Sequence, residues 1–341
     1  MKTGVIGASG YSGGELLRLL SRHPEFELSY IAAGSQAGSS VISVHPQLFD
    51  LGDVAFQATD VSLMNDCQIL FFALPHGESS KLISQVKDSV KIVDLGADYR
   101  LSSADSWHEY YGGTHAGTWI YGLPEIPGQS AKISAASHVA NPGCYATAIA
   151  LAAAPAISYG CIDPADIVVV ASSGTTGAGR KAAINLSASE VMGSLSSYKF
   201  GGVHQHTPEI EETLGLLTKG KVIVSFTPVL APMSRGILAT TTAKLKTEIS
   251  SSEVHDLYSK FYSGSPFVTV LPLGAMPATS AVIGSNSVSI QVAIDTHSQR
   301  LVVSSAIDNL GKGAASQAIQ NANLMCGFEE TTGISVTGLG A

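Results

Sequence analysis

The sequence predicts an α/β fold with two domains, the first a doubly wound parallel sheet and the second an α+β domain with a mixed, largely antiparallel sheet. Three observations support this prediction. The chain has 341 residues, a length typical of about two domains. Its first hundred residues alternate short apolar runs with segments of helical periodicity. Its second half carries long β-rich runs with few helices between them.

Four apolar runs are expected to form the strands of the first domain: residues 3–7, 26–33, 67–75 and 90–98. Between the first two, residues 12–24 place Leu16, Leu17 and Leu20 at helical spacing, and Pro24 marks the end of that helix. Residues 79–90 are expected to form a shorter helix. This alternation of strands and helices is typical of a parallel sheet with helices on both faces.

The second domain is predicted to begin with a helix over 145–157 and a strand over 166–174. Further strands are expected at 221–229, 236–245, 287–295 and 300–308, the last two joined as an antiparallel hairpin by a THSQ turn. A final helix over 311–325 is expected to return to the first domain. We therefore predict one domain from residues 1–143 and 311–341, and a second from residues 144–310.

Composition excludes several classes of function. Apolar residues make up 45% of the chain and charged residues 13%, which suits large cores and argues against disorder. The net charge of −8, without any dense Lys/Arg run, argues against a nucleic-acid partner. No apolar stretch reaches the roughly 18 uninterrupted residues of a membrane span, and the N-terminus lacks the pattern of a signal peptide. We expect no membrane association.

The four cysteines, Cys67, Cys144, Cys161 and Cys326, are widely scattered and form no CxxC pair. This spacing favours reduced thiols over a disulfide framework or a zinc site, and it predicts a cytoplasmic protein.

A glycine-rich stretch, GASGYSG, lies between the first expected strand and the first expected helix. Its glycines are Gly7, Gly10 and Gly13, separated by Ser9, Tyr11 and Ser12. Glycines at this point let the backbone approach a pyrophosphate, and the start of the helix offers N–H donors and a positive dipole end. The spacing GxxGxxG is weak evidence alone, and a turn used only for packing is the alternative. Its position favours a Rossmann-type dinucleotide-binding domain.

The type of dinucleotide is suggested by an absence in the sequence. Domains selective for NAD usually place Asp or Glu after the second strand, to hold the ribose 2′-hydroxyl. Here no acidic residue occurs between Glu27 and Asp50, and the strand ends in AAGSQAGSS. Ser35 in this stretch could hydrogen-bond a 2′-phosphate, although no Arg accompanies it. We expect the cofactor to be NADP.

Cys144 follows Asn141-Pro142-Gly143 and directly precedes an alanine-rich run of high helix propensity. A thiol at a helix N-terminus has a lowered pKa, and the helix N–H groups could also stabilise an oxyanion. This pattern predicts a nucleophile. A buried structural cysteine is the alternative, and it is the better interpretation for the other three cysteines.

The stretch HQHTPEI places His204 and His206 two residues apart, followed by Glu209. An imidazole near a thiol can take its proton and later protonate an alkoxide. Metal binding is an alternative, but no Cys, Asp or Glu lies at the expected ligand spacing. A further alternative is that both residues are surface histidines with no role in catalysis.

Three arginines lie at expected strand ends or glycine turns: Arg100 in DLGADYRL, Arg180 in SSGTTGAGRK and Arg235 in PMSRGI. The planar guanidinium can hold a phosphate or carboxylate with two parallel hydrogen bonds. Because the chain has only 19 Lys and Arg residues, these positions are candidates for binding an anionic substrate. Surface salt bridges are the alternative for each of them.

Several of these motifs together resemble one enzyme family. The stretches GASGYSGGEL, HPQL, ALPHG, DLGADYRL, YGLPE, NPGCYAT, SGTTGAGRKA, HQHTPEI, PMSRGIL and DNLGKGAASQAIQNANLM occur in order over nearly the whole chain. They resemble the N-acetyl-γ-glutamyl-phosphate reductases of arginine biosynthesis, which are relatives of aspartate-semialdehyde dehydrogenases. Many members carry Ser-Arg after the second strand where this chain reads AAGSQAG, so the residues that contact a 2′-phosphate stay open.

The resemblance implies the NADPH-dependent reduction of N-acetyl-γ-glutamyl phosphate to N-acetylglutamate semialdehyde, with release of phosphate, through a thioester on Cys144. It implies His206 as the acid–base group. Because antiparallel β-rich second domains often dimerise through their sheets, we expect a homodimer or homotetramer, and the ligand spacing leads us to expect no metal ion. We expect substrate contacts from Arg100, Asn141, Arg180, His204, Glu209 and Arg235. We expect cofactor contacts from Gly7, Ser9, Gly10, Tyr11, Ser12, Gly13, Ser35, Pro75, Ser173, Gly174 and Asn309.

Three alternatives remain at this point. Two are close relatives in chemistry: an aspartate-semialdehyde dehydrogenase, and a carrier-linked aminoadipyl-phosphate reductase. The third belongs to a different class, a non-catalytic NADP-binding regulatory protein, which would need the glycine loop but not Cys144 and His206 together.

Overall fold

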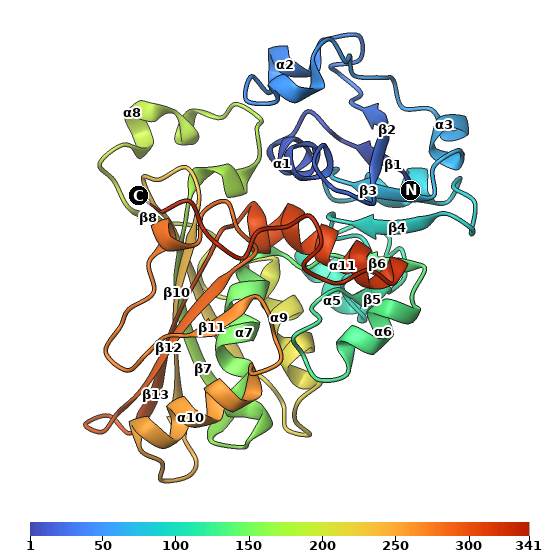
Figure 1. Cartoon of the computed structure of the whole chain (residues 1–341). Helices are drawn as coiled ribbons and strands as arrows, with labels where there is room; N and C mark the ends of the chain where they lie inside the picture. The colour runs from blue at the N-terminus through green and yellow to red at the C-terminus, as the bar shows by residue number, and fades with distance from the viewer. Residues whose placement is uncertain (341) are drawn as a thin grey trace. The chain divides into compact units, whose positions relative to one another are not determined.

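The computed structural model describes residues 1–340, and the chain passes between two structural units (Figure 1). The first unit contains Met1–Pro142 and Ala314–Ile334. The second contains Gly143–Gly313 and the segment that begins at Ser335. The chain therefore enters the second unit directly before Cys144 and leaves it directly after Gly313.

The first unit is built on a six-stranded sheet in the order β2-β1-β3-β4-β6-β5, and all of its neighbouring strands run parallel. The strands are β1 (Lys2–Ile6), β2 (Glu27–Ala32), β3 (Ile69–Phe72), β4 (Lys91–Asp94), β5 (Ile120–Tyr121) and β6 (His138–Ala140). The four predicted strands are confirmed as β1 to β4, and they read as apolar runs because a parallel sheet is buried on both faces.

Helices cover both faces of this sheet. They are α1 (Tyr11–Leu20), α2 (Val41–Val44), α3 (Val61–Asn65), α4 (Ser79–Ile83), α5 (Ala104–Tyr110), α6 (Gln129–Ala135) and α11 (Ser316–Cys326). Phe72 belongs to a buried cluster with Met64 of α3 and Ile83 of α4. Its neighbour Phe71 contacts Phe26, which in turn contacts Phe328 beyond α11. Because successive side chains of a strand point to opposite faces, the sheet is doubly wound as predicted.

The second unit contains a seven-stranded mixed sheet in the order β11-β12-β13-β10-β7-β9-β8. The strands are β7 (Ile162–Ser173), β8 (Ser196–Ser197), β9 (Val224–Leu230), β10 (Ile237–Leu245), β11 (Val268–Val270), β12 (Val288–Asp295) and β13 (Arg300–Ile307). Only the pairs β11–β12 and β7–β9 are parallel. The predicted mixed, largely antiparallel sheet is therefore confirmed, including the hairpin of β12 and β13.

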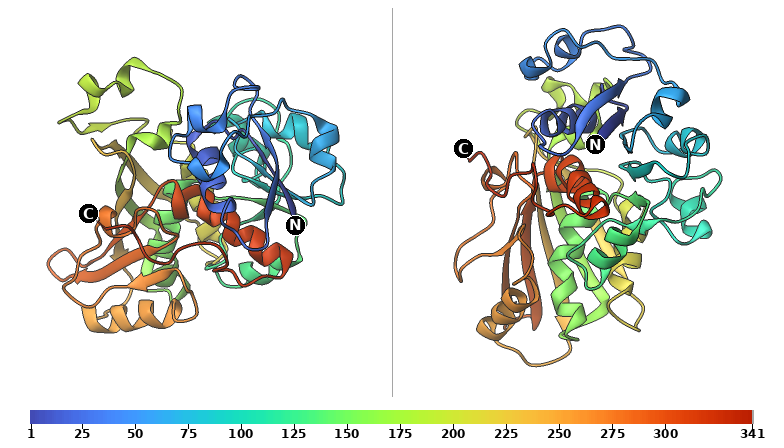
Figure 2. Two further views of the ribbon diagram at one scale, coloured as in Figure 1. Left: turned by 45° about the horizontal axis from the view of Figure 1, so that its top comes forward. Right: turned by 45° about the vertical axis from the view of Figure 1, so that its right-hand side comes forward.

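Helices pack on one face of the second sheet. The helix α7 (Cys144–Ser158) lies against β7, β10 and β13, and α9 (His206–Gly215) and α10 (Ser251–Phe261) flank it (Figure 2). Every residue of α7 from Tyr145 to Ile157 is buried, which fits its uniformly apolar sequence. On β7, the buried Val169 alternates with the exposed Val168 and Val170, so the other face of the sheet carries apolar groups at the surface.

Three boundaries differ from the sequence-based expectation. The helix expected over 79–90 ends at Ile83 as α4, and turns fill the rest. The helix expected over 311–325 begins with a π-helical turn, Gly311–Ala315, before α11. The C-terminal segment, expected in the first domain, bonds to the second unit, where the Asn286 N–H donates to the Ser335 carbonyl and the Leu339 N–H to the Ile283 carbonyl.

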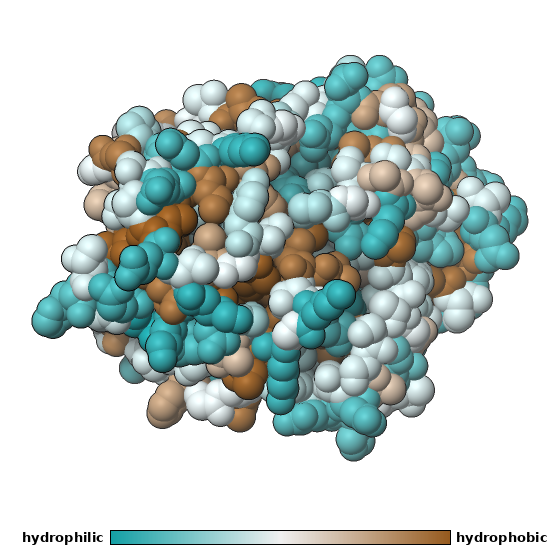
Figure 3. All heavy atoms as spheres, turned by 90° about the horizontal axis from the view of Figure 1, so that it is seen from below, coloured by the Kyte–Doolittle hydropathy of each residue, from teal (hydrophilic) through white to brown (hydrophobic). Residues whose placement is uncertain are grey.

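The surface carries hydrophobic patches separated by hydrophilic side chains (Figure 3). Within residues 1–340, each helix is either too short or too polar to cross a bilayer.

Candidate functional site

The glycine loop joins β1 to α1 in the first unit, as the sequence predicts. Gly7 has φ of +82°, and a Cβ there would lie 2.4 Å from the Ala73 carbonyl oxygen. A Cβ on Gly13 would lie 2.4 Å from the Gly7 carbonyl oxygen. Both positions therefore require glycine, whereas a Cβ on Gly10 would find its nearest neighbour at 3.6 Å. The tight turn leaves Ser9, Tyr11 and Ser12 at least partly accessible.

The start of α1 offers the anion site that a dinucleotide phosphate needs. Gly10 is the N-cap and supplies no side-chain hydrogen bond, and the Gly14 N–H closes the first helical bond to its carbonyl at 2.9 Å. Helix N-terminal N–H groups and the helix dipole favour a phosphate there. His45, from the HPQL stretch, contacts the glycine loop and the start of α1. Its Nε2 lies 2.9 Å from the Ala8 carbonyl oxygen, and its ring packs against Gly14.

Two further loops at the same edge of this sheet carry predicted cofactor residues. Ser35 follows β2 and is exposed. Pro75 follows β3 and is also exposed, in a loop held by Asp98. The Asp98 carboxylate accepts the Gly77 N–H at 2.6 Å and the Ser80 N–H at 3.0 Å. The carboxyl ends of β1, β2 and β3 thus present the predicted cofactor residues of the first unit, whereas Ser173, Gly174 and Asn309 belong to the second unit.

Asp94, the last residue of β4, and Arg100, in the loop that follows β4, are both buried. Burial raises the pKa of Asp94 to about 7, although its Oδ1 accepts bonds from the Ser79 hydroxyl and the Gly96 N–H. Arg100 is only 7% exposed and donates to the Leu95 carbonyl at 2.7 Å. Part of its guanidinium fork is therefore used to hold its own loop.

Asn141 has a structural role that the sequence did not suggest. It is fully buried, and its Nδ2 donates to the Ala314 carbonyl at 3.1 Å. Its Oδ1 accepts a bond from Asn321 Nδ2 at 3.0 Å. Both ends of the amide thus join β6 to the segment that enters α11. Its contact with substrate stays a prediction.

In the second unit, Cys144 is the first residue of α7. Gly143 is the N-cap and has no side chain to bond the N–H groups of the first turn, which Cys144 begins. This is the position in which a helix dipole favours a thiolate.

The other three cysteines lie in environments that disfavour the thiolate. Cys67 and Cys161 are buried, and Cys326 is half-buried. Burial raises the pKa of all three thiols. Because the thiolate is the nucleophile, these residues are poor candidates for covalent chemistry at neutral pH.

The helix α9 brings two side chains to the residue before Cys144. Its first residue, His206, packs its imidazole against Gly143 so closely that a Cβ on that glycine would lie 2.5 Å from Nε2. Glu209, one turn later and 1% exposed, accepts the Gly143 N–H at 2.6 Å. His206 and Glu209 thus converge on the Gly143–Cys144 turn, although Glu209 lies 66 residues after Gly143 in the chain.

His204 differs from His206 in its surroundings. Burial lowers the pKa of His204 to about 2, with a smaller contribution from His206. Its Nδ1 accepts the His206 N–H at 3.1 Å, which requires an unprotonated nitrogen. The rings of Tyr145, Phe226 and Tyr198 pack edge-on around it. His204 is therefore neutral near pH 7, and it orients the start of α9.

The remaining predicted residues of this unit organise the loop after β7. Gly174 packs against the backbone of Ser234, which leaves no room for a side chain. The Asn309 side chain accepts the Gly236 N–H at 2.8 Å and donates to the Thr176 hydroxyl at 3.0 Å.

The two predicted arginines of this unit, Arg180 and Arg235, lie in different surroundings. Arg235 forms a two-bond ion pair with the buried Asp308, at 2.6 and 3.0 Å. Arg180 lies exposed beyond the Thr175–Ala178 turn. The binding of an anionic substrate by either arginine stays a prediction.

Comparisons with known proteins match both units. A model described as the NAD-binding domain of semialdehyde dehydrogenases matches residues 2–135, and one described as their dimerisation domain matches residues 144–309. The chain is 52% identical over 338 residues to the N-acetyl-gamma-glutamyl-phosphate reductase of Acidothermus cellulolyticus, covering 99% of this chain and 98% of that protein. It is 53% identical over 339 residues to the reductase of the same name from Salinispora tropica, with 99% of each chain covered.

The chain belongs to the N-acetyl-gamma-glutamyl-phosphate reductase family. It is therefore an oxidoreductase of amino-acid biosynthesis that carries a nucleotide-binding domain.

Solved structures of more distant proteins share the fold of this family member. Aspartate semialdehyde dehydrogenase II from Vibrio cholerae, complexed with ASA, matches with a TM-score of 0.70 at 16% identity, over 95% of this chain and 98% of that one. Aspartate semialdehyde dehydrogenase with NADP from Candida albicans matches with a TM-score of 0.65 at 16% identity, again over 95% and 98%.

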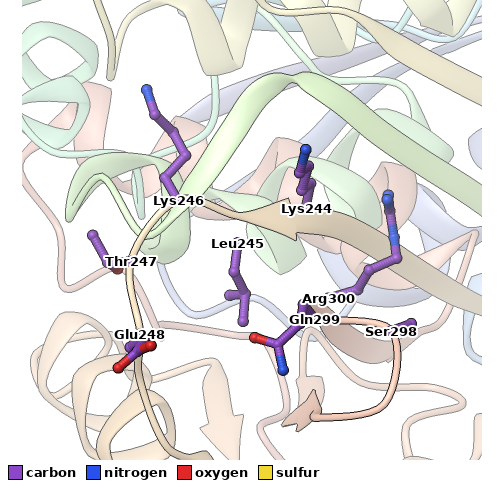
Figure 4. Close-up of a pocket in the computed structure, with 8 residues that line it drawn as sticks. All are labelled: Lys244, Leu245, Lys246, Thr247, Glu248, Ser298, Gln299 and Arg300. Carbon is purple, nitrogen blue, oxygen red and sulfur yellow. The ribbon is translucent and has the colours of Figure 1, made fainter.

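One surface cavity of this reductase-family chain lies away from the predicted residues. It has a volume of about 360 Å³ and is lined by residues 244–248 and 298–300 (Figure 4). It lies at the Leu245 end of β10, opposite the end that follows Arg235. Arg300 at its edge is paired with Asp166. The cavity contains none of the predicted catalytic or binding residues, and residues 1–340 contain no cluster of three or more His, Cys, Asp or Glu placed to hold a metal ion.

Two tyrosines near the family's candidate site were not predicted as site residues. Tyr145, directly after Cys144, has its hydroxyl 3.0 Å from that of Tyr198, and burial raises the pKa of Tyr198 to about 12. Both phenols are therefore neutral hydrogen-bonding groups. The adjacency of Tyr145 to Cys144 was a signal in the sequence, whereas Tyr198 lies 53 residues away and left none.

Proposed function

We propose that this chain catalyses the NADPH-dependent reduction of N-acetyl-γ-glutamyl phosphate to N-acetylglutamate semialdehyde, with release of inorganic phosphate. The observation that supports it best is the half-buried Cys144 at the start of α7, with His206 packed against the residue before it. The relatives at about half identity carry this activity in their names.

In this proposal the Cys144 thiolate attacks the acyl-phosphate carbonyl carbon. A C–S bond forms, the C–O bond to the phosphate breaks, and phosphate leaves, so the acyl group becomes a thioester on the enzyme. Cys144 begins α7, so the N–H groups of its first turn are the donors that would stabilise negative charge on the carbonyl oxygen. NADPH, when bound, supplies a hydride, which reduces the acyl group to the oxidation level of the aldehyde.

His206 is the proton carrier in this scheme. A thiol must lose its proton before it attacks, and a thiolate must be released as the aldehyde departs. Half-buried His206 lies beside the Cys144 turn, whereas His204 has a pKa too low to exchange protons near pH 7. We assign the acid–base role to His206 and a positioning role to His204.

The first unit supplies the residues that would hold the dinucleotide. Gly7 and Gly13 admit a close backbone approach, and the uncapped start of α1 suits the pyrophosphate. The exposed Ser35 follows β2 with no carboxylate between Glu27 and Asp50, so nothing in this stretch repels a 2′-phosphate. These features support NADP over NAD.

We also propose that the chain forms a homodimer or homotetramer through the second unit. The face of β7 and β10 opposite α7 presents Val168 at 38% and Val170 at 49% exposure. Apolar groups in a row on a sheet face are typical of an interface. The dimerisation-domain model covers this sheet.

The proposed activity is tested with a panel of acyl phosphates: N-acetylglutamyl, aspartyl and aminoadipyl. We expect NADPH oxidation with N-acetylglutamyl phosphate, matched one to one by phosphate release, and little with the others. Cys144→Ser should abolish turnover, while Cys67→Ser and Cys161→Ser should retain most of it. Preference for another acyl phosphate would overturn the substrate assignment, and turnover by Cys144→Ser within tenfold of the unmodified enzyme would overturn the covalent mechanism.

A further inference from the structure

Two glycines beside the candidate catalytic residues occupy positions where the backbone does not require glycine. Gly143 has φ of −71° and ψ of 148°, ordinary extended values for any residue. Gly313 is also not among the glycines with positive φ. Some other constraint must therefore make a side chain unsuitable at these two positions.

At Gly143 the constraint is the imidazole of His206. A Cβ on Gly143 would lie 2.5 Å from Nε2, 2.7 Å from Cε1 and 2.8 Å from Cδ2 of that ring. Real Cβ atoms essentially never approach other atoms within 3.0 Å. The imidazole can occupy this place beside the Cys144 turn only because Gly143 has no side chain.

At Gly313 the constraint is Cys144 itself. A Cβ on Gly313 would lie 2.7 Å from the Cys144 Cβ and 3.2 Å from its Cα. These atoms sit at the root of the side chain and on the helix backbone, so no rotamer change relieves the overlap. Gly313 lies in the π-helical turn Gly311–Ala315, where its N–H donates to the Asp308 carbonyl at 2.9 Å. Such turns are rare and frequent at functional sites.

We propose that Gly143 and Gly313 are positioning residues for the reaction: Gly143 admits the His206 imidazole beside the nucleophile, and Gly313 sets where the Cys144 side chain begins. The proposal deepens the proposed function and rests on it, because it assigns the two glycines to the same thiol and imidazole. A misplacement of about 1 Å can cost roughly a hundredfold in rate, so the space left by two absent side chains is sufficient to matter.

The first experiment measures a property of Cys144 that does not require turnover. The rate of Cys144 alkylation by iodoacetamide is followed across pH 5–9 by peptide mass spectrometry, in the full-length protein. An imidazole beside a thiol favours the thiolate, so we expect Gly143→Ala to slow alkylation at neutral pH by about tenfold and to move the pH profile upward. Gly215→Ala is the control, because it lies on the same helix as His206 and its Cβ would meet nothing within 4 Å.

A double-mutant cycle then separates a specific effect from a general distortion. If Gly143 acts through His206, Gly143→Ala should slow alkylation in the wild-type background and have no further effect in the His206→Asn background. An equal slowing in both backgrounds would overturn the proposal for Gly143. An unchanged pH profile in the single variant would overturn it as well.

The second experiment compares two glycines of the same turn. Gly313→Ala should lower kcat by about a hundredfold and slow Cys144 alkylation, while the NADP dissociation constant stays within twofold. Gly311→Ala is the matched control: its Cβ would lie 2.2 Å from the Ser285 carbonyl oxygen, and the next nearest atoms belong to Asp308, at 3.1 and 3.3 Å. It should lower Tm but keep the alkylation rate. Equal slowing of alkylation by both variants would overturn the proposal for Gly313.

The alkylation measurements also separate this proposal from the proposed function. If N-acetylglutamyl phosphate is not a substrate but Gly143→Ala still changes alkylation only when His206 is present, the positioning role stands and the substrate assignment fails. If the substrate is turned over but the glycines leave alkylation unchanged, the positioning role fails alone.

Discussion

His204 and His206 lie two residues apart in the sequence, yet their imidazoles differ in burial and in the residues around them. His204 is 7% exposed inside a group of aromatic rings, whereas His206 is half-buried beside the Cys144 turn. Burial removes water from an imidazole and so disfavours its charged form. The deeper burial of His204 is therefore the reason that we give the two histidines different roles, although they are close in sequence.

The histidine variants test this division. His206→Asn should lower kcat by roughly 10²–10⁴, the usual contribution of a positioned acid–base group. His204→Asn should lower kcat less, and it should leave the pH dependence of kcat between pH 6 and 8 unchanged, because a group with a pKa of about 2 does not titrate there. Steady-state kinetics of both variants between pH 6 and 8 measure these effects on kcat. A larger loss in His204→Asn would reverse the two roles.

At the scale of single residues, local features were easier to predict from the sequence than contacts between distant residues. NPGCYAT predicted the helix that begins at Cys144, because the signal is local. For Asn141 the sequence led only to a predicted substrate contact, which stays a prediction, and it did not reveal the bond to Asn321, 180 residues away. Glu209 was also expected at the substrate, and its carboxylate holds the Gly143 N–H, 66 residues away. Such pairings depend on tertiary structure, and no pattern within a window of residues reveals them.

At the scale of elements, the long apolar strands were predicted and the short ones were not. β5 and β6 contain two and three residues, and they exist as strands only because they pair with neighbours in the sheet. The helix α10 did carry a local signal, a capping box of Ser250 and Glu253, that could have been recognised. The π-helical turn at Gly311 depends on the close approach of the Ser285 carbonyl and had no such signal.

The glycine loop gives a prediction at this scale. Gly7→Ala should weaken NADP binding at least tenfold, because φ of +82° and the Ala73 carbonyl at 2.4 Å both oppose a Cβ. Gly10→Ala is the control within the same loop, since its φ is −74° and the nearest atom would lie at 3.6 Å. Isothermal titration with NADP measures both. An equal loss of NADP affinity in Gly7→Ala and Gly10→Ala would contradict this prediction. It would mean that the loop excludes a side chain at both positions and that the conformation of Gly7 is not the cause.

At the scale of the whole molecule, buried histidines link stability to pH. His23 is 7% exposed, and burial lowers its pKa below the usual 6.5. Its Nδ1 accepts the Phe26 N–H at 3.2 Å, and its Nε2 lies 3.1 Å from Asn323 Oδ1. The folded protein therefore holds this imidazole neutral, while the unfolded chain binds a proton below about pH 6.5.

The sign of the effect follows from proton binding. Below pH 6.5 the unfolded state binds more protons at His23 than the folded state, so the free energy of unfolding falls as pH falls. We expect the stability difference between the unmodified protein and His23→Gln to narrow as the pH falls from 7.5 to 5.5, because the lowered pKa of His23 in the folded state is the only source of this narrowing. Urea denaturation at the two pH values measures it. A difference that stays constant or widens would show that His23 is not held neutral.

The proposed oligomer is also a property of the whole molecule. Val170→Lys would place a charge on the exposed face of β7, and burying it against a second copy would cost several kcal/mol. Sedimentation velocity should therefore show a smaller species than the unmodified protein. Phe49→Lys, at a residue 77% exposed in the first unit, should keep the original assembly. An unchanged sedimentation coefficient for Val170→Lys would place the interface elsewhere.

The central claim is that Cys144 carries the acyl group. It is tested most directly by mixing the protein with N-acetylglutamyl phosphate in the absence of NADPH and measuring the intact mass after an acid quench. We predict one added N-acetylglutamyl group per chain, mapped by peptide analysis to Cys144 and absent in Cys144→Ser, with one phosphate released for each group added. An acyl group on any other residue, or an adduct that persists in Cys144→Ser, would contradict the account.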